Sequence, residues 1–543
     1  MSIEHIGTTP YKDQRPGTSG LRKKVSVFQQ PGYLENFVQS IFDALPDVEG
    51  HTLVLGGDGR FYNRHAIQII IRMAAAHGFA RVLAGRGGLL STPAVSCIIR
   101  KYQALGGIIL SASHNPGGQA GDFGIKFNTS NGGPAPEALT EQIYRNSQKL
   151  QTWAISSVSS ININSIGQQR IETMLLEVID PVQDYCEMQQ QLFDFPAIRK
   201  LFASGFTMCF DAMHAIGGPY AHQIFENLLG AAPGSVINGT PLEDFGGHHP
   251  DPNPVNAAEL IALMHSPQAP DFGAASDGDA DRNLIAAPKL CVTPSDSLAI
   301  LAEHAHRVPA YRNGLAGIAR SMPTSRACDA VAKALNISCY EVPTGWKYFG
   351  NLLDAGKITL CGEESYGTGS NHIREKDGIW AVLFWLNIIA ASGKAVNTLV
   401  TDHWARFGRH FYSRHDFEAI ESGKANSLIE HLRAQLPQLA GKPLGRYTVA
   451  QADEFSYHDP VDHSISSNQG LRLLFTDGSR IVFRLSGTGT EGATLRVYLE
   501  QFEADPARHG TPPQEALAGL VTIAYQVANI REYTGLQQAS VIT

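Results

Sequence analysis

Residues 52–110 read TLVLGGDGRFYNRHAIQIIIRMAAAHGFARVLAGRGGLLSTPAVSCIIRKYQALGGIIL. Short apolar runs bounded by glycine alternate in this segment with longer runs whose apolar residues recur at helical spacing. Such alternation is typical of parallel strands joined by helices, so it predicts a doubly wound α/β unit. The expected strands are Thr52–Leu55, Ala80–Ala84 and Gly107–Leu110, and the expected helices are Asn63–His77 and Pro93–Tyr102.

The same alternation restarts twice further along the chain, which predicts second and third α/β units. The second unit is expected to contain strands Phe206–Phe210 and Phe272–Ala275 with helices Tyr220–Leu229 and Ala257–His265. The third is expected to contain strands Leu315–Ala319, Ser338–Val342 and Lys357–Cys361 with helices Ser325–Leu335 and Lys347–Leu353.

The last part of the chain has a different pattern. Leu471–Phe475 and Ser479–Leu485 are alternating runs joined through Asp477-Gly478, a strong hairpin signal. The predicted fold class is therefore three mixed α/β domains of similar topology plus a C-terminal α+β domain. At about 150 residues per domain, the 543 residues fit four domains. We expect them over residues 1–188, 189–293, 294–408 and 409–543.

The composition is that of a loop-rich globular protein, with 43% hydrophobic and 17% charged residues and 53 glycines. Lys and Arg number 43 against 51 Asp and Glu, a net charge of −8. No global positive field therefore favours nucleic acid or an anionic membrane as a partner. Residues 156–167 are rich in serine and asparagine and are expected to form an exposed loop.

Sorting signals and disulfides are not indicated. The first 20 residues lack the apolar core of a secretory signal. The most apolar segment, Ile379–Ala391, is shorter than the roughly 18 residues that a membrane span needs. Seven cysteines, an odd number with no C-x-x-C pair, suit reduced thiols. We therefore expect a cytoplasmic protein, a monomer or weak homodimer.

Four polar, glycine-rich loops follow apolar runs, where open α/β sheets place their ligands. The first, the serine loop (residues 111–118), reads Ser-Ala-Ser-His-Asn-Pro-Gly-Gly. Its Ser113, directly followed by His114, is a candidate covalent nucleophile, although an ordinary turn has the same residue types. Lys126 is an isolated cation in the next apolar run, either functional or a strand lysine whose charge reaches solvent.

The aspartate loop (residues 276–282) reads Ser-Asp-Gly-Asp-Ala-Asp-Arg. Its carboxylates Asp277, Asp279 and Asp281 can converge on one hard cation and leave positions for another oxygen. An EF-hand is excluded, because the sixth position should be Gly but is Arg282, and the twelfth should be Glu but is Pro288. Arg282 suits a phosphoryl oxygen. Zinc held by histidines such as His248 and His249 is a weaker alternative.

The glutamate loop (residues 362–367) reads Gly-Glu-Glu-Ser-Tyr-Gly. Glu363, Glu364 and Ser365 can exchange hydrogen bonds with the vicinal hydroxyls of a sugar, and general acid or base catalysis is a second interpretation. Lys376 supplies a cation a short distance downstream.

The arginine loop (residues 484–492) reads Arg-Leu-Ser-Gly-Thr-Gly-Thr-Glu-Gly. It contains G-x-G-x-x-G, but an alternating strand follows instead of a helix, so the loop is not a dinucleotide fingerprint. Small residues flanked by Arg484 and Arg496 can bind one phosphate monoester.

Together the four loops describe phosphoryl transfer on a phosphosugar. A phosphate site far from the nucleophile in sequence implies that one phosphate is held while the other end of the substrate reacts. That is the geometry of a mutase. Two competing hypotheses are a metal-dependent phosphatase, which needs only the first two loops, and a non-catalytic relative, which should have lost Ser113 or an aspartate.

The sequence resembles the phosphoglucomutases of the α-D-phosphohexomutase superfamily over nearly its whole length. Besides the four loops, the residues that carry the resemblance are Pro16-Gly17-Thr18-Ser19-Gly20-Leu21-Arg22, Gly57-Asp58-Gly59-Arg60, Asp211-Ala212-Met213-His214, Pro343-Thr344-Gly345-Trp346-Lys347 and His372-Ile373-Arg374-Glu375-Lys376-Asp377-Gly378. The resemblance implies a heart-shaped arrangement of the four domains around a central active-site cleft.

The resemblance also implies roles for individual residues. Ser113 is implied as the phosphoserine and, with Asp277, Asp279 and Asp281, as a ligand of Mg²⁺. Further implied catalytic residues are Arg22, His114, Lys126 and Lys376, and the implied substrate-binding residues are Arg282, Thr344, Lys347, Glu363, Ser365, His372, Arg484, Ser486, Gly487, Thr488 and Arg496. Small departures from the family pattern include Ala280 for a frequent Gly, Tyr366 for a frequent Phe, and Glu491 beside the phosphate site.

The implied reaction starts with transfer of the Ser113 phosphoryl group to glucose 1-phosphate, with Mg²⁺ and Arg282 neutralising charge. Glucose 1,6-bisphosphate results, reorients, and returns its other phosphate to Ser113, releasing glucose 6-phosphate. The Gly-Glu-Glu-Ser form of the glutamate loop resembles the glucose-preferring branch of the family. The sequence does not choose between Lys126 and His114 for proton transfer.

Overall fold

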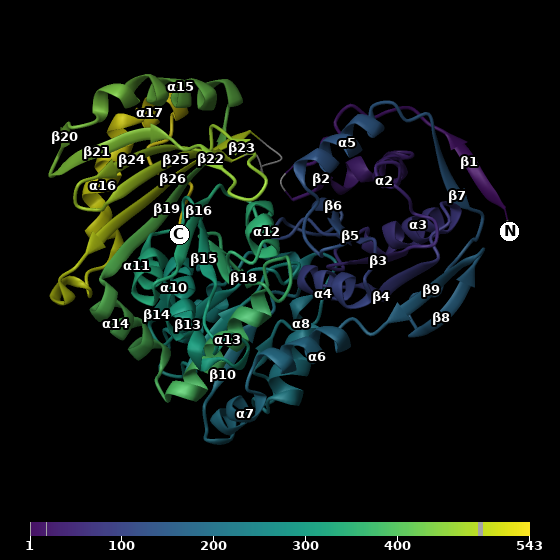
Figure 1. Ribbon diagram of the computed structural model, residues 1–543, viewed down its shortest axis with the longest axis horizontal. Helices are drawn as coiled ribbons and strands as arrows, with labels where there is room; N and C mark the ends of the chain where they lie inside the picture. Colours follow the sequence, from purple (N-terminus) through teal and green to yellow (C-terminus); the bar gives the residue numbers. More distant parts are fainter. Residues whose placement is uncertain (1, 18, 487–491) are drawn as a thin grey trace.

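The computed structural model describes residues 2–17, 19–486 and 492–543. Four units, each built on its own sheet, are called domains I to IV in chain order. Domain I forms the right lobe in Figure 1 and domain IV the upper left lobe, while domains II and III form the base. This heart-shaped arrangement of three mixed α/β domains and one α+β domain confirms the predicted fold class.

Domain I has a seven-stranded mixed sheet whose parallel strands lie at its centre. In sheet order its strands are β2 (Leu21–Lys24), β6 (Asp122–Thr129), β5 (Gly106–Leu110), β3 (Thr52–Gly57), β4 (Arg81–Leu89), β9 (Met174–Ile179) and β8 (Gly167–Ile171). β3 pairs in parallel with β4 and β5, whereas β6 runs antiparallel to β5 and carries Lys126.

Helices cover both faces of this sheet, as predicted for a doubly wound unit. The side chains of α2 (Tyr33–Phe42) and α3 (Asn63–Ala76) are buried in one core, and those of α4 (Thr92–Tyr102) belong to another core, shared with domain II. Further elements are α1 (Val25–Phe28), α5 (Glu137–Ser147), α6 (Gln183–Leu192), and a two-stranded sheet of β1 (Ile3–Gly7) and β7 (Thr152–Ser156).

The segment 156–167 is largely irregular and most of its residues are exposed, as predicted, but two of its isoleucines are buried. Ile161 and Ile163 are only 6% and 2% exposed and join the core that contains α3. The segment is fixed by backbone contacts, because the Gln68 amide donates to the Ile161 carbonyl and the Gly87 N–H donates to the Ile163 carbonyl. Alternation of isoleucine with polar residues allows one side of the loop to be buried.

Domain II has the sheet order β11 (Val236–Ile237), β10 (Met208–Asp211), β12 (Phe272–Ala275), β13 (Leu284–Ala287) and β14 (Leu290–Val292). The first three strands are parallel to one another. β13 pairs antiparallel with β12, and β14 pairs antiparallel with β13. Its helices are α7 (Phe195–Ala203), α8 (Gly217–Ala221), which continues into a π-helical segment η1 (His222–Leu228), and α9 (Ala258–Met264); a 3₁₀ turn η2 covers Phe245–Gly247.

Domain III has the sheet order β16 (Ser338–Val342), β15 (Gly317–Ser321), β17 (Leu360–Glu363) and β18 (Gly367–Ser370), with β18 antiparallel. Its helices are α10 (Pro294–His304), α11 (Ala327–Leu335), α12 (Lys347–Asp354), α13 (Gly378–Ser392) and α14 (Val396–Phe407), with 3₁₀ turns η3 (Ala305–Arg307) and η4 (Pro309–Tyr311). All the strands and helices predicted for this unit are present, with ends shifted by a few residues.

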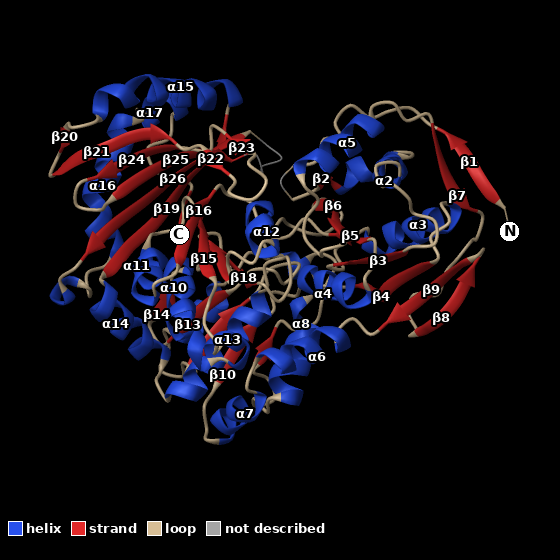
Figure 2. Ribbon diagram, in the orientation of Figure 1, coloured by secondary structure: helices blue, strands red, loops and turns tan. Residues whose placement is uncertain are grey.

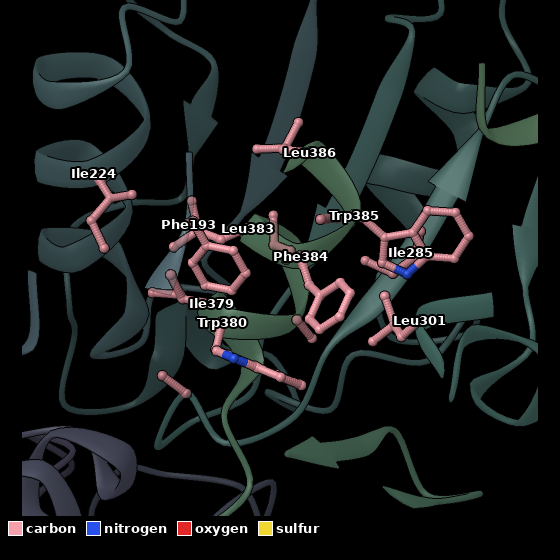
Figure 3. Close-up of a cluster of buried hydrophobic side chains, with 14 of the residues drawn as sticks. Phe193, Ile224, Ile285, Leu301, Ile379, Trp380, Leu383, Phe384, Trp385 and Leu386 are labelled. Atoms are coloured by element: carbon pink, nitrogen blue, oxygen red, sulfur yellow. The ribbon is translucent and has the colours of Figure 1, made fainter. Parts of the chain in front are cut away.

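α13 contains the most apolar segment of the sequence, and it is a core helix. Trp380 and Trp385 are fully buried, and Phe193 of domain II and Leu301 of α10 lie beside the helix in Figure 3. No single helix of the described chain is long and apolar enough to cross a membrane; α13 and α14 pass that test only as a pair, which is bent by 85°.

Domain IV is a seven-stranded sheet in the order β20 (Pro443–Leu444), β21 (Tyr447–Glu454), β24 (Leu471–Phe475), β25 (Arg480–Ser486), β26 (Ala493–Glu503), β19 (Arg409–Ile420) and β27 (Val541–Ile542). The predicted hairpin joins β24 and β25. Other elements are β22 (Tyr457–His458), β23 (Ile465–Ser466), α15 (Ser422–Leu439), α16 (Pro513–Val527), α17 (Ile530–Thr534) and η5 (Pro506–Arg508). Figure 2 shows the helices α15 to α17 on one side of this sheet.

Alternation along β25 gives the sheet two buried faces. Ile481 and Phe483 pack against α15 and α16, whereas Val482 between them packs with Met322 and Trp346 of domain III. Domain IV therefore rests on domain III through the face of its sheet that its own helices leave uncovered. The chain passes between the two domains at Gly408, whose φ of 82° is favourable for glycine.

Candidate active site

All four domains line one cleft, to which the serine, aspartate and glutamate loops contribute residues and the described part of the arginine loop contributes Arg484 and Ser486. The serine, aspartate and glutamate loops each follow a parallel strand, β5, β12 and β17, and the arginine loop joins β25 to β26. Of the residues named from the sequence, those lining the cleft are Arg22, Ser113, His114, Lys126, Asp281, Arg282, Thr344, Lys347, Glu363, Ser365, Lys376, Arg484, Ser486 and Arg496. Gly487 and Thr488 lie outside the described residues.

The hydroxyl of Ser113 points from domain I to the aspartate loop of domain II. It donates a hydrogen bond to Oδ2 of Asp277 over 2.8 Å, and the Nδ1 atom of His114 lies 3.5 Å from it. Ser113 has a φ of 52°, a left-handed conformation that is uncommon for a serine and is often found at functional sites. Ala280 and Tyr366, in the aspartate and glutamate loops, are also left-handed, with φ of 62° and 68°.

A buried arginine fixes the backbone of the serine loop. Arg60 donates to the carbonyl oxygens of Ser113 over 2.7 Å and Asp122 over 2.9 Å, and its Nε pairs with Asp58 over 2.9 Å. Asp58 also accepts from the hydroxyl of Ser111, which in turn accepts from the N–H of Ser113. The nucleophile candidate is therefore held by a buried network.

The three carboxylates of the aspartate loop are buried, and each offers an oxygen within 4.8 Å of the others. Asp279 accepts from Thr92 over 2.5 Å, and its Oδ2 lies 3.5 Å from Nζ of Lys126. Asp281 pairs with Nζ of Lys376 over 3.0 Å. The Oδ1 atoms of Asp279 and Asp281 have no hydrogen-bond donor among the described residues. Three carboxylates, two of which have an oxygen without a hydrogen-bond donor in the described chain, are suitable ligands for a hard divalent cation.

The charge distribution agrees with a cation-binding role. Burial and the neighbouring carboxylates raise the pKa of Asp277 well above its usual value. Burial acts in the same direction on Asp279, but Lys126 and the Thr92 hydroxyl outweigh it and lower that pKa. Burial and mutual repulsion therefore raise the free energy of the charged carboxylates, and a bound cation would lower it.

A second group of cations and a neutral histidine surround Ser113. Arg282 lies 3.3 Å from Asp251 and 3.8 Å from Asp277. Burial, with Arg282 and Arg22 nearby, lowers the pKa of His114 well below its usual value. His114 is therefore a neutral ring and a weak base, and the cations can face a phosphoryl group.

In the glutamate loop the two carboxylates have different surroundings. Glu363 lines the cleft, accepts from the Gly345 N–H over 2.9 Å, and has a pKa raised by burial. Glu364 instead accepts from the buried Ser321 hydroxyl over 2.9 Å. The loop is joined to the aspartate loop by a bridge between Gly367 and Arg282. Glu363 and Ser365 are therefore the members available to a ligand.

Domain IV contributes three arginines to the cleft: Arg414 of β19, Arg484 of β25 and Arg496 of β26. Arg414 and Arg496 share Asp416, at 3.1 and 3.7 Å. Arg484 donates to the Gln469 carbonyl over 3.2 Å. Two of these guanidinium groups share one carboxylate and the third contacts a carbonyl, so the group can also bind a phosphate.

Two predicted ligand residues have other partners in this structure. His372 does not line the cleft; its Nε2 lies 3.0 Å from Asp377, its Nδ1 lies 2.7 Å from the Ser370 hydroxyl, and it stacks on Trp380. Since Asp377 caps α13, His372 holds the start of that helix. Lys347 lines the cleft, but its Nζ donates to the exposed Glu137 of α5 in domain I over 2.8 Å.

Three polar residues of the site have no functional signal in the sequence. Thr92 contacts Asp279, Asp251 contacts Arg282, and Arg414 lines the cleft. Their segments suggest only a helix start, a proline-rich loop and a strand, respectively. The Gly57–Arg60 stretch carries the family resemblance, but its sequence does not show that Arg60 holds the serine loop.

Fold and site together define a phosphoryl-transfer enzyme of the phosphohexomutase type. Models of phosphoglucomutase/phosphomannomutase α/β/α domains I, II and III match residues 13–153, 183–289 and 293–407, and a model of the phosphoglucomutase-1 C-terminal domain matches residues 409–540. The chain belongs to the phosphoglucomutase/phosphomannomutase family, and it is an isomerase.

Individual relatives match over the full chain. A phosphoglucomutase of Rhizobium radiobacter is 59% identical, with 100% of both chains covered. A probable cytoplasmic phosphoglucomutase 1 of Arabidopsis thaliana is 51% identical with the same coverage. The crystal structure of pp63/parafusin, a phosphoglucomutase from Paramecium in an open form, has a TM-score of 0.92 at 49% identity and covers 100% of this chain and 99% of that one.

Proposed function

We propose that this protein is a Mg²⁺-dependent phosphoglucomutase that interconverts glucose 1-phosphate and glucose 6-phosphate through a phosphorylated Ser113 and glucose 1,6-bisphosphate. The observation that carries the proposal is the hydrogen bond of 2.8 Å between Ser113 and Asp277, which joins the nucleophile candidate to the three-carboxylate loop. The names of full-length relatives support the reaction class.

Asp277, Asp279 and Asp281, with an oxygen on Ser113, would hold the Mg²⁺. A bound Mg²⁺ supplies charge neutralisation for the phosphoryl oxygens. Arg282 binds the same phosphoryl group, and the Arg60 network keeps Ser113 in position. The buried position of Ser113, 4% exposed, protects its phosphoryl group from water.

Sugar hydroxyls are bound by Glu363 and Ser365 in both orientations of the intermediate. The Gly345 N–H binds Oε1 of Glu363 and so orients the carboxylate. Its Oε2 would accept from a sugar hydroxyl. The Gly-Glu-Glu-Ser sequence favours glucose over mannose as the substrate. Arg484, Arg496 and the rest of the arginine loop bind whichever phosphate is not reacting.

Proton transfer with the sugar hydroxyl has two candidate groups. Lys126 lies beside Asp279, and the neutral His114 lies beside Ser113. Two carboxylates fix the position of Lys126 in the cleft, Asp279 at 3.5 Å and Glu375 at 3.9 Å. Variants of both residues decide which group transfers the proton.

A coupled assay tests the proposed function directly. Purified protein with glucose 1-phosphate should form glucose 6-phosphate, glucose 1,6-bisphosphate should accelerate it, and EDTA should stop it until Mg²⁺ is restored. Release of inorganic phosphate without glucose 6-phosphate would favour the phosphatase hypothesis, and no turnover at all would favour the non-catalytic one. By analogy with the Arabidopsis relative, we propose a cytoplasmic location.

A further inference from the structure

Two cysteine side chains meet in domain III, away from the cleft. The Sγ atoms of Cys328 and Cys339 lie 3.8 Å apart. Cys328 is the second residue of α11 and is 1% exposed, whereas Cys339, the second residue of β16, is half-buried. Cys339 is therefore the less buried member of the pair.

Both thiols share one carboxylate. Sγ of Cys339 donates to Oδ1 of Asp329 over 3.3 Å, and Sγ of Cys328 lies 3.8 Å from the same atom. Arg320 binds both oxygens of that carboxylate, with Nε and Nη2 at 2.6 and 2.8 Å. A metal bound by Cys328, Cys339 and Asp329 would have to displace this guanidinium, and two sulfurs alone do not complete a tetrahedral site. The arrangement favours a reaction between the two sulfurs.

We propose that Cys328 and Cys339 form a reversible disulfide when the protein meets a low-molecular-weight disulfide such as oxidised glutathione. The sulfurs need to approach from 3.8 Å to about 2 Å, which side-chain rotation at the half-buried Cys339 can supply. The hydrogen bond between the thiols, together with burial, raises the pKa of the Cys328 thiol well above its usual value. Cys339 is therefore the thiol that reacts first.

The reaction is thiol–disulfide exchange in two steps. The Cys339 thiolate attacks one sulfur of the small disulfide, so a mixed disulfide forms, the original S–S bond breaks and one thiolate leaves. The Cys328 thiolate then attacks the Cys339 sulfur, which forms the Cys328–Cys339 bond and releases the second thiolate. The two cysteine protons pass to the released thiolates; the cysteines lose two electrons and the small disulfide gains them.

The location gives this disulfide a structural consequence. α11 begins directly after Arg326, which donates its backbone N–H to Glu500 of domain IV over 2.9 Å. β16 carries Glu341, which accepts from Arg472 of domain IV over 2.9 Å. A bond between Cys328 and Cys339 would link two of the segments of domain III that contact domain IV. It should also raise the thermal unfolding midpoint, because it restricts the unfolded chain.

The test uses the full-length, reduced protein. It is incubated with oxidised glutathione at mildly alkaline pH, free thiols are alkylated, and the digest is mapped by mass spectrometry. We expect a Cys328–Cys339 linked peptide lacking two hydrogens, five alkylated cysteines out of seven, and full reversal by dithiothreitol. The thermal midpoint should rise on oxidation and return on reduction.

Variants separate this site from general thiol oxidation. Cys291→Ser removes the other half-buried cysteine and should leave the linked peptide unchanged. Cys328→Ser and Cys339→Ser should abolish both the peptide and the rise in midpoint. Alkylation of all seven cysteines after oxidation of the native protein, or glutathione retained on Cys339 with Cys328 free, would overturn the proposal; both results come from the unmodified chain and do not depend on the folding of a variant.

Discussion

The hydroxyl of Ser113 lies 2.8 Å from Oδ2 of Asp277, and 164 positions separate the two residues in the chain. Ser113 follows a strand of domain I and Asp277 a strand of domain II, so this contact assembles the reactive centre across a domain boundary. The packing of α4 with α6 and α8 between the domains keeps the two loops together, since these elements share one core.

Asp279→Asn should weaken Mg²⁺ binding by at least about tenfold, because it removes one of three ligand charges. The oxygen that remains in the variant side chain can still accept from Thr92, but the ion pair with Lys126 is lost, so the fold of the variant is checked by circular dichroism. Calorimetric Mg²⁺ titration measures the effect without turnover. Asp251→Asn is the matched control. Asp251 contacts Arg282 but is not a member of the group of three aspartates in the aspartate loop. An unchanged Mg²⁺ affinity in Asp279→Asn contradicts the metal assignment.

Glu363→Ala should lower kcat/KM for glucose 1-phosphate by about 10- to 100-fold, as expected for losing hydrogen bonds to a charged group. Hydrolysis of the Ser113 phosphate by water should change much less, because that reaction has no sugar to position. Steady-state kinetics and a phosphate-release assay check the two effects. If mannose 1-phosphate is the better substrate of the unmodified protein, the glucose assignment is wrong.

Domain IV should rotate toward the other domains when a bisphosphate binds, about a hinge near Gly408 within residues 405–416. The intermediate needs an open cleft to reorient and a closed one to react, and domain IV supplies Arg414, Arg484 and Arg496 to that cleft. X-ray scattering with and without a bisphosphate analogue measures the rotation. Arg496→Ala should raise KM about tenfold or more with the Ser113 phosphate content unchanged.

The control for that variant is Arg508→Ala, an arginine of domain IV whose side chain is 65% exposed. It should leave KM unchanged. Identical scattering in the free and bound states, together with a normal KM in Arg496→Ala, leaves the closing movement without support.

Glu500 should make stability depend on pH. It is 1% exposed and binds Arg480 and His410. Burial alone would raise its pKa, but Arg480 and His410 hold it well below its usual value. A lowered native pKa means that its stabilisation is present above the unfolded value of about 4.3 and is lost as pH falls toward the native value.

Glu500→Gln should therefore cost about 3 kcal/mol at neutral pH, because the buried Arg480 loses the carboxylate bound to its Nε. The difference from the unmodified protein should shrink below about pH 4.3, because Glu500 then binds a proton in the unfolded chain while it is still charged in the folded protein. Urea unfolding at several pH values measures this. A difference that stays constant from pH 7 down to pH 3 contradicts the assigned role of this ion pair.

Much of the site could be predicted because its residues follow strands. Ser113, Asp277 and Glu363 each come after a short apolar run, and open α/β sheets bring the carboxyl ends of their strands to one edge. The same local signals predicted the β24–β25 hairpin through Asp477-Gly478.

Residues that act through distant contacts could not be found in this way. Thr92 lies 187 positions from Asp279, and its neighbours Ser91 and Pro93 suggest only the start of a helix. Arg414 lies inside a strand whose alternation does not distinguish a cleft residue from a surface one. His372 is the opposite case. The family resemblance implied a ligand contact, but its two ring nitrogens contact Asp377 and Ser370.

The most direct test of the account is the location of the covalent phosphate. The protein is incubated with glucose 1,6-bisphosphate, and its peptides are mapped by mass spectrometry, with Ser113→Ala and Ser111→Ala analysed in parallel. The account predicts one phosphate on Ser113, its loss to added glucose 1-phosphate, and nearly complete inactivity of Ser113→Ala. Phosphate on another residue, or full activity of Ser113→Ala, would contradict it.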